Sequence, residues 1–175
     1  LFDLELTNQQ IKLLKGRRRI DCANELVKLI PQEVKTEELL TLHKPISRKL
    51  ILKAKAMPGA ESLVKSCHKN NLPMALVTSS SLESFQIKTA PHKWMSLFSV
   101  KVLGDDKLLT KGKPAPDPYL LAANKFNIDP QECWAVEDSI SGVSSALEAG
   151  CFVFFLKEKN DETTKKEIFE KHKNI

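Results

Sequence analysis

The sequence contains few aromatic residues, few cysteines and no long hydrophobic run. Phe, Trp and Tyr make up 6% of the 175 residues, with a single tyrosine. The scarcity of aromatic side chains and the scatter of the lysines argue against nucleic acid as a partner, although the formal net charge is +5. The longest apolar run, 151–156, is far shorter than the roughly 20 residues of a membrane-spanning helix, so we expect no membrane span.

The four cysteines lie far apart, with no pair at the spacing of a metal site or a redox motif. Such cysteines suit a reducing environment, so we expect a cytoplasmic protein. The first residues contain no basic segment followed by an apolar stretch of the signal-peptide type. Because the chain opens at Leu1 without a Met, we expect its N-terminus to be trimmed or incomplete. The sequence gives no indication of oligomeric state.

Residues 5–55 have the pattern of helices alone. Thr7 begins a capping box, and Gly16 can end the helix that this box opens. A further helical segment begins at Thr36, and we expect Pro45 to interrupt it. The apolar fraction of 42% is sufficient for a folded chain with a core.

Beyond Pro58 the pattern alternates between helix and strand. Such alternation predicts an α/β fold in which helices cover both faces of a parallel sheet. Leu1–Leu4 would supply one more strand of this sheet. The other strand candidates are the apolar runs 72–77, 98–103, 133–136 and 151–156, with helices expected over 59–70, 118–126 and 140–149.

Polar residues follow several of these strands, at the edge of the sheet where ligands bind in such folds. They are Asp3, Thr78 and the pair Glu137 and Asp138, and a loop between strands carries Lys113. Phosphoryl transfer through an aspartyl phosphate needs a carboxylate nucleophile, a magnesium ion with oxygen ligands, and donors that neutralise the transferred group. Each of these requirements has a candidate residue in the sequence.

The order of these residues resembles the four motifs of the haloacid dehalogenase superfamily. The most specific segments are 112–117, Gly-Lys-Pro-Ala-Pro-Asp, and 137–142, Glu-Asp-Ser-Ile-Ser-Gly. Both are typical of the subfamily that contains β-phosphoglucomutase and phosphoglycolate phosphatase. The resemblance implies a Rossmann-like core formed by residues 1–4 and 56–175. It also implies an inserted helical cap over 5–55, which we expect to be incomplete.

The resemblance implies a role for each residue at the edge of the sheet. Asp3 would attack phosphorus and also bind Mg²⁺, Asp138 would be a second metal ligand, and Glu137 would bind the metal or one of its ligands. Thr78 and the adjacent hydroxyl of Ser79 would bind the phosphoryl oxygens. Lys113 would bridge the nucleophile and the phosphate. In the cap, Arg19 stands at the position of a phosphate-binding arginine.

Each of these residues also has a purely structural interpretation. Glu137 and Asp138 can begin a turn into a helix, although such a turn explains one acid better than two. Thr78 can cap the helix that follows it. The run of three arginines that ends at Arg19 can be a solvated face, and Lys113 can be one exposed lysine among many.

The sequence departs from the family at the first motif, Asp-x-Asp-Gly-Thr, where it has Asp-Leu-Glu-Leu-Thr over residues 3–7. Leu6 replaces the turn glycine, and Glu5 replaces the second Asp, which serves as general acid and base. We therefore expect that Leu4 and Glu5 are not covalent neighbours and that the segment carrying this Asp is missing between them. If they are neighbours, Glu5 becomes the candidate acid and base.

Three functions are consistent with these residues. A phosphatase would hydrolyse a small phosphorylated metabolite, such as a sugar phosphate or phosphoglycolate. A phosphosugar mutase would pass the phosphate to a second position and would need a closed cap that excludes water. A non-enzymatic phosphoacceptor module would use the same residue types, but such receivers place the acidic pair before the acceptor Asp, whereas here it comes last. We therefore expect the phosphatase.

Overall fold

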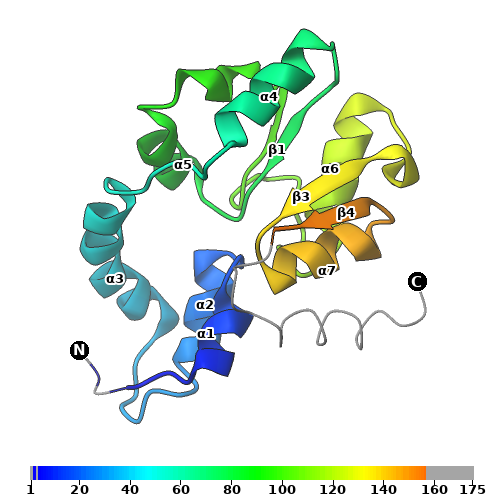
Figure 1. The fold of residues 1–175 in the computed structure, drawn as a ribbon. Coiled ribbons are helices and arrows are strands. Elements are labelled where there is room, and N and C mark those ends of the chain that lie inside the picture. Colours follow the sequence, from blue (N-terminus) through cyan, green and yellow to red (C-terminus); the bar gives the residue numbers. More distant parts are fainter. Residues whose placement is uncertain (1, 3, 157–175) are drawn as a thin grey trace.

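The computed structural model describes residue 2 and residues 4–156 (Figure 1). Helices alone occupy the first part of the chain, and strands alternate with helices in the second, as the sequence predicts. Within the described part, no helix is long and apolar enough to cross a membrane. In chain order the elements are α1 (Asn8–Leu14), α2 (Arg19–Leu26), α3 (Thr36–Ile51), α4 (Ala60–Lys69), β1 (Ala75–Val77), α5 (Leu82–Thr89), the 3₁₀ helix η1 (Lys93–Leu97), β2 (Val100–Val102), α6 (Asp117–Phe126), the 3₁₀ helix η2 (Pro130–Glu132), β3 (Trp134–Glu137), α7 (Ile140–Glu148) and β4 (Phe152–Phe155).

Local sequence signals explain where the N-terminal helices begin and end. The predicted capping box of α1 is confirmed, since Thr7 accepts from the backbone of Gln10 and the Gln10 side chain accepts from the backbone of Thr7. Gly16 follows α1 with φ +81°, a left-handed conformation that suits glycine. The predicted interruption at Pro45 is wrong, because α3 continues through this residue. A proline removes one backbone donor, and the other hydrogen bonds of a 16-residue helix can hold it together.

The described strands are parallel, as predicted, and are hydrogen-bonded in two pairs. β1 pairs with β2, and β3 pairs with β4. The predicted strand over Leu1–Leu4 is not observed at Phe2 or Leu4, and residues 1 and 3 lie outside the described part. Phe2 and Leu4 instead line a cavity of about 470 Å³ with apolar side chains of the helical region.

Helix α6 connects the two strand pairs. It contacts β1 and β2 of one pair and also α7, which packs on the other pair. Its Tyr119 belongs to a buried cluster with Ala135, Ala146, Ala149 and Cys151, and Val77 at the end of β1 packs against this cluster. The carboxyl ends of β1 and β3 therefore lie beside the same core.

Small side chains allow α7 to pack closely on the ends of the strands. Ser144, Ser145 and Ala146 are almost fully buried. A Cβ atom at Gly142 would overlap the Glu137 carboxylate, so only glycine permits this approach of α7 to β3. The sequence segment 137–142 thus has a packing function in addition to any chemical one.

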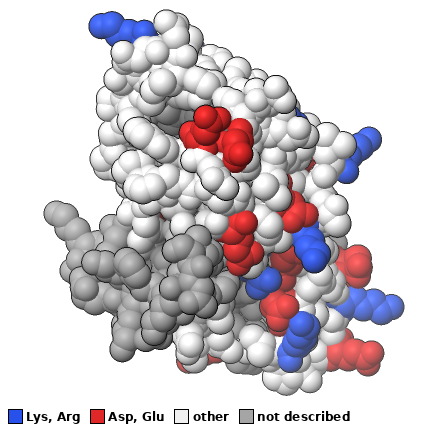
Figure 2. Space-filling view, turned by 90° about the vertical axis from the view of Figure 1, so that its right-hand side faces the viewer, with Lys and Arg blue, Asp and Glu red and all other residues white. Residues whose placement is uncertain are grey.

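Charged side chains of both signs share the part of the surface shown in Figure 2. Lysine and arginine side chains alternate there with aspartate and glutamate, and no continuous basic stripe is visible among the described residues of this face. The net positive charge of the chain is therefore not gathered on this face.

Candidate active site

Lys113 connects the carboxyl ends of β1 and β3. Its ammonium donates a hydrogen bond to the backbone oxygen of Val77, over 3.2 Å, and forms an ion pair with Glu137. Both side chains of this ion pair are about 6% exposed. Thr78 follows β1 and Asp138 follows β3, so the structure brings three of the predicted site regions to one place.

A buried hydroxyl completes this cluster. Tyr119 donates to the Glu137 carboxylate and lies 3.5 Å from the Lys113 ammonium, whose nitrogen is 5.1 Å from the centre of the tyrosine ring. Burial, followed by the nearby charge of Glu137, raises the pKa of Tyr119 well above its usual value. The phenol therefore stays protonated and acts as a donor to Glu137.

Asp138 differs from Glu137 in its surroundings. Its side chain is 51% exposed, and one of its oxygens lies 3.7 Å from the Lys15 ammonium. The next residue, Ser139, is the N-cap of α7 and accepts from the backbone of Gly142. The turn into a helix that the sequence suggested after Glu137 and Asp138 is therefore present, with Ser139 as its cap, while Asp138 stays accessible to a ligand at the strand end.

One of the hydroxyl groups after β1 caps helix α5, and the others belong to the loop before that helix. Ser81, not Thr78, caps α5, so the capping interpretation of Thr78 is wrong. The backbone of Thr78 donates to Val102 over 2.9 Å, and its hydroxyl accepts from the backbone of Ser80 over 3.2 Å. Ser79 donates to the backbone oxygen of Gly16 over 2.6 Å. The loop is thus fixed beside the strand end.

The turn between α1 and α2 lies directly against this edge. Ser141 donates to the backbone oxygen of Lys15 over 2.6 Å, in addition to the contact between Ser79 and Gly16. A Cβ atom at Gly16 would overlap the side chains of Ser139 and Ser141. Residues far apart in the sequence therefore enclose the strand ends between the helical region and the core.

Arg19 begins α2 and points toward α5. Its guanidinium donates to the hydroxyl of Ser84 over 3.0 Å. The neighbouring Arg18 instead forms an ion pair with Asp21 over 2.7 Å and lies against Gly112. The run of arginines is therefore not a uniformly solvated face.

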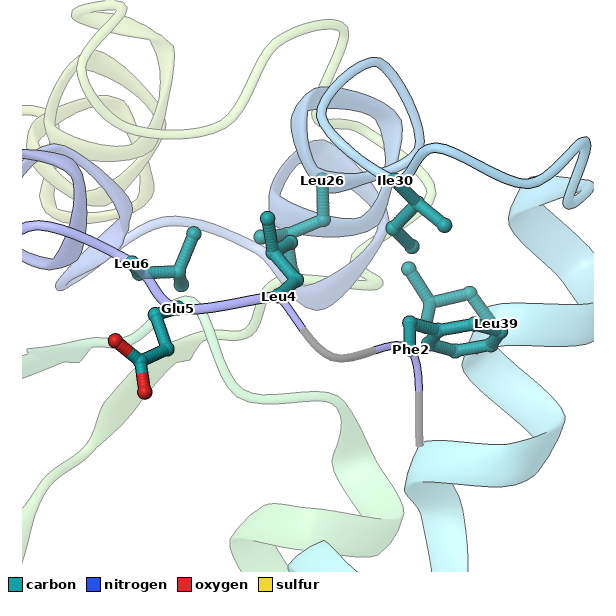
Figure 3. Close-up of a pocket in the computed structure, with 7 residues that line it drawn as sticks. All are labelled: Phe2, Leu4, Glu5, Leu6, Leu26, Ile30 and Leu39. Atoms are coloured by element: carbon teal, nitrogen blue, oxygen red, sulfur yellow. The ribbon is translucent and has the colours of Figure 1, made fainter.

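The remaining part of the predicted site involves the first motif. Asp3, the predicted nucleophile, lies outside the described residues. The expectation that a segment is missing between Leu4 and Glu5 stays a prediction. Glu5, the candidate acid and base if the two residues are neighbours, lines the apolar cavity with Leu26, Ile30 and other residues of the N-terminal region (Figure 3).

The chemistry of the carboxylates suits magnesium better than a softer metal. Glu137 and Asp138 supply oxygen ligands at adjacent positions, and Mg²⁺ is bound in proteins by one or two carboxylates together with water and phosphate oxygens. The described residues contain no group of three His, Cys, Asp or Glu side chains arranged to hold a metal. Asp3, the third predicted metal ligand, lies outside the described residues.

Sequence reasoning overlooked Tyr119, although a signal was present. Tyr119 is the single tyrosine of the chain and lies six residues after Lys113. Ala122 and Ala123 follow it at helical spacing, and all three are buried on one face of α6. A polar hydroxyl on an otherwise apolar helix face indicates a buried hydrogen-bond partner.

Polar groups at the carboxyl ends of parallel strands place the chain in the Rossmann-like α/β class. Within that class it belongs to the haloacid dehalogenase-like hydrolase family, whose model matches residues 3–150. The family resemblance of the sequence motifs is therefore confirmed.

Two curated relatives show the extent of the sequence similarity. The chain is 42% identical over 113 residues to a probable pseudouridine-5'-phosphatase of Drosophila melanogaster, covering 62% of this chain and 49% of that protein. It is 33% identical over 155 residues to hexitol phosphatase A of Escherichia coli K12, covering 89% of this chain and 64% of that protein. The chain thus spans about half to two thirds of the length of these curated relatives.

A solved structure shows the same fold. The β-phosphoglucomutase of Clostridium difficile superposes with a TM-score of 0.74 at 18% identity, covering 97% of this chain and 84% of that chain. At this level of identity the likeness concerns the fold alone.

Proposed function

We propose that the protein is a magnesium-dependent phosphatase that hydrolyses a small phosphorylated metabolite through an aspartyl phosphate on Asp3. The observation that carries this proposal is the position of Lys113, whose buried ammonium joins the end of β1 to the acidic end of β3. A fixed cation at this place can neutralise the charge that develops on a transferred phosphoryl group. The phosphatases among the relatives support the same reaction class.

The roles of the other residues follow from their positions. A carboxylate oxygen of Asp3 would form the bond to phosphorus as the ester P–O bond breaks, and water would then hydrolyse the aspartyl phosphate. Thr78 and Ser79 would donate to the phosphoryl oxygens from the loop after β1. Asp138, Glu137 and Asp3 would hold Mg²⁺, which supplies a positive charge for the phosphoryl oxygens when it is bound.

The helical region would act as the cap of this site. Its turn at Lys15 and Gly16 already covers the strand ends through hydrogen bonds to Ser141 and Ser79. Such coverage would limit the access of water and therefore keeps the phosphosugar mutase as a second candidate. We also propose a cytoplasmic location, because the four cysteines are free.

The test uses full-length protein with a panel of phosphorylated metabolites and magnesium. A phosphatase releases free phosphate, whereas a mutase isomerises a sugar phosphate without a matching release of phosphate. The variant Asp3→Asn keeps the shape of the side chain but cannot form the aspartyl phosphate, so it should lose turnover and stay folded. Wild-type rates of phosphate release from this variant would exclude the proposed mechanism.

Two lysines provide a matched comparison for the same assay. Lys113→Ala removes the buried cation and should lower kcat by about 10²-fold or more, because this charge is needed most in the transition state. Lys111→Ala removes an exposed lysine two residues away and should leave kcat within about twofold. Equal losses in both variants would show that Lys113 has no special role.

A further inference from the structure

Every second residue of β3 and β4 is exposed, so this strand pair has an apolar outer face. The register pairs Trp134 with Phe152 and Val136 with Phe154, which places these side chains on the same side of the two strands. Ala135, between the exposed residues of β3, belongs to the buried cluster that contains Ala146 of α7, so α7 covers the opposite side. The outer face consists of Trp134, Val136, Phe152, Phe154 and Leu156.

Such exposure is unusual for parallel strands, which are normally covered on both faces. Trp134 is 77% exposed, Phe152 59% and Phe154 44%. The three rings already contact one another edge to face, since the centroid of Phe154 lies 5.7 Å from that of Trp134 and 5.2 Å from that of Phe152. Covering this aromatic cluster with apolar groups would remove its surface from water and is therefore favourable.

The size of the aromatic cluster favours a short segment of the same chain over a second copy. Because an aromatic side chain buries 150–250 Å², the exposed fractions of the three rings correspond to roughly 270–450 Å². A stable interface between two proteins buries about 800 Å² on each partner. A tethered segment can bind through a smaller area, because its effective concentration is of millimolar order.

The chain itself continues directly from this face. Leu156, the last residue of the outer face, is followed by residues 157–175, which lie outside the described part. Residues 157–163 are all polar and supply the length for a change of direction. A segment that begins here can therefore reach the outer face without crossing any other element.

The sequence of residues 164–175 has the pattern of an amphipathic helix. Thr164 and Glu167 have the spacing of a capping box, directly before two apolar residues. At helical spacing the apolar residues fall on one side, and lysine, glutamate and asparagine occupy the opposite side. The apolar residues are Ile168, Phe169 and Ile175.

We infer that residues 164–175 bind across the outer face as a helix, with Ile168, Phe169 and Ile175 against the aromatic cluster. The lengths agree, because 12 helical residues extend about 18 Å and the five residues 152–156 extend about 16 Å. The outer face is thus an internal docking surface for the end of this chain. This inference does not rest on the proposed function, since none of these side chains belongs to the candidate active site.

Hydroxyl-radical labelling of full-length protein, followed by mass spectrometry, tests whether this segment covers Trp134. Phe169→Asp should make the labelling of Trp134 about threefold faster than in the wild type, because a charged side chain would no longer bind to the apolar face. Asn174→Asp adds the same charge on the opposite side of the helix and should leave the labelling unchanged. Equal labelling of Trp134 in the wild type and in Phe169→Asp would overturn the inference.

A change on the outer face provides the reciprocal test. Trp134→Ser removes an exposed side chain and should leave the core folded, while hydrogen exchange of peptides from 164–175 should become about tenfold faster. Leu63→Ser removes an exposed apolar side chain of α4 and is the matched control, which should leave this exchange unchanged. Unchanged exchange of 164–175 in Trp134→Ser would overturn the inference. Labelling of Trp134 that slows as the protein concentration rises would assign the outer face to a second copy and would also overturn it.

Discussion

The Tyr119 hydroxyl donates one of the hydrogen bonds that the buried Glu137 carboxylate accepts at the end of β3. Tyr119→Phe removes the donor to Glu137 and keeps the ring that packs in the core. Loss of a hydrogen bond to a buried charged group costs about 1–3 kcal/mol, so we expect the free energy of unfolding to fall by this amount. Urea unfolding monitored by circular dichroism measures the change.

The activity of the same variant gives a second measurement. Tyr119→Phe leaves the Glu137 carboxylate with one hydrogen bond fewer to orient it. If Glu137 helps to bind magnesium, the magnesium concentration needed for half-maximal activity should therefore rise by a few fold. Tyr119→Leu removes the ring as well and should destabilise the protein further, by about 3–5 kcal/mol in total. A Tyr119→Phe protein as stable as the wild type would show that the hydrogen bond contributes nothing.

The sequence could predict individual polar residues of the site but not all their partners. Lys113 was identifiable because Pro114 favours an extended backbone before it and because a specific motif surrounds it. Its contact with Val77 is formed by residues 36 positions apart, and no local pattern encodes such a contact. The donor role of Tyr119 depends in the same way on the packing of α6 against β3.

Among the elements, two glycines allow the effect of a contact with another element to be separated from the effect of backbone strain. Gly16 and Gly59 have almost equal φ angles, +81° and +82°, so alanine at either position costs about 1–2 kcal/mol of backbone strain. Only Gly16 also contacts another element, since a Cβ there would meet Ser139 and Ser141, whereas Gly59 faces open space. The two substitutions should therefore cause the same backbone strain, but only the one at Gly16 should also disturb a contact with another element.

We expect Gly16→Ala and Gly59→Ala to be destabilised similarly by strain, and Gly16→Ala alone to lose the proposed phosphatase activity. Displacement of the turn would break the hydrogen bonds from Ser79 and Ser141 that hold it at the strand ends. Thermal unfolding gives the stability, and kcat/KM gives the activity. Comparable activity in the two variants would mean that the position of this turn is unimportant for the reaction.

Elements were predictable where local chemistry defines them, whereas the packing of the first residues was not. The capping box at Thr7 and the apolar runs of β1 to β4 are local signals, and these elements form where expected. Leu1–Leu4 has an apolar pattern that suits a strand or a packed extended segment equally well. The observed contacts of Phe2 and Leu4 depend on the side chains of Leu26 and Leu39, which the pattern of the segment itself cannot specify.

At the scale of the whole molecule, burial is distributed unequally between the N-terminal helices and the core. No residue of α1 or α3 is buried, and Ala23 is the buried residue of α2. Most of α7 is buried, and α6 has four buried residues. Because the free energy of local opening follows the buried contacts of a segment, the helices of residues 8–51 should open more easily than the core.

Native-state hydrogen exchange followed by mass spectrometry measures this difference. We expect peptides from α1 and α3 to exchange at least about tenfold faster than peptides from α6 and α7, because their helical hydrogen bonds can break without exposing a core. Low concentrations of urea should leave the exchange of α1 and α3 almost unchanged, since local opening exposes little surface, whereas exchange from α7 should accelerate as global unfolding becomes easier. Equal protection of α1, α3 and α7, with the same response to urea, would mean that the helical region and the core unfold as one cooperative unit. In that case the turn at Gly16 would not move away from the strand ends without unfolding of the core, and substrate would have to reach the site by another route.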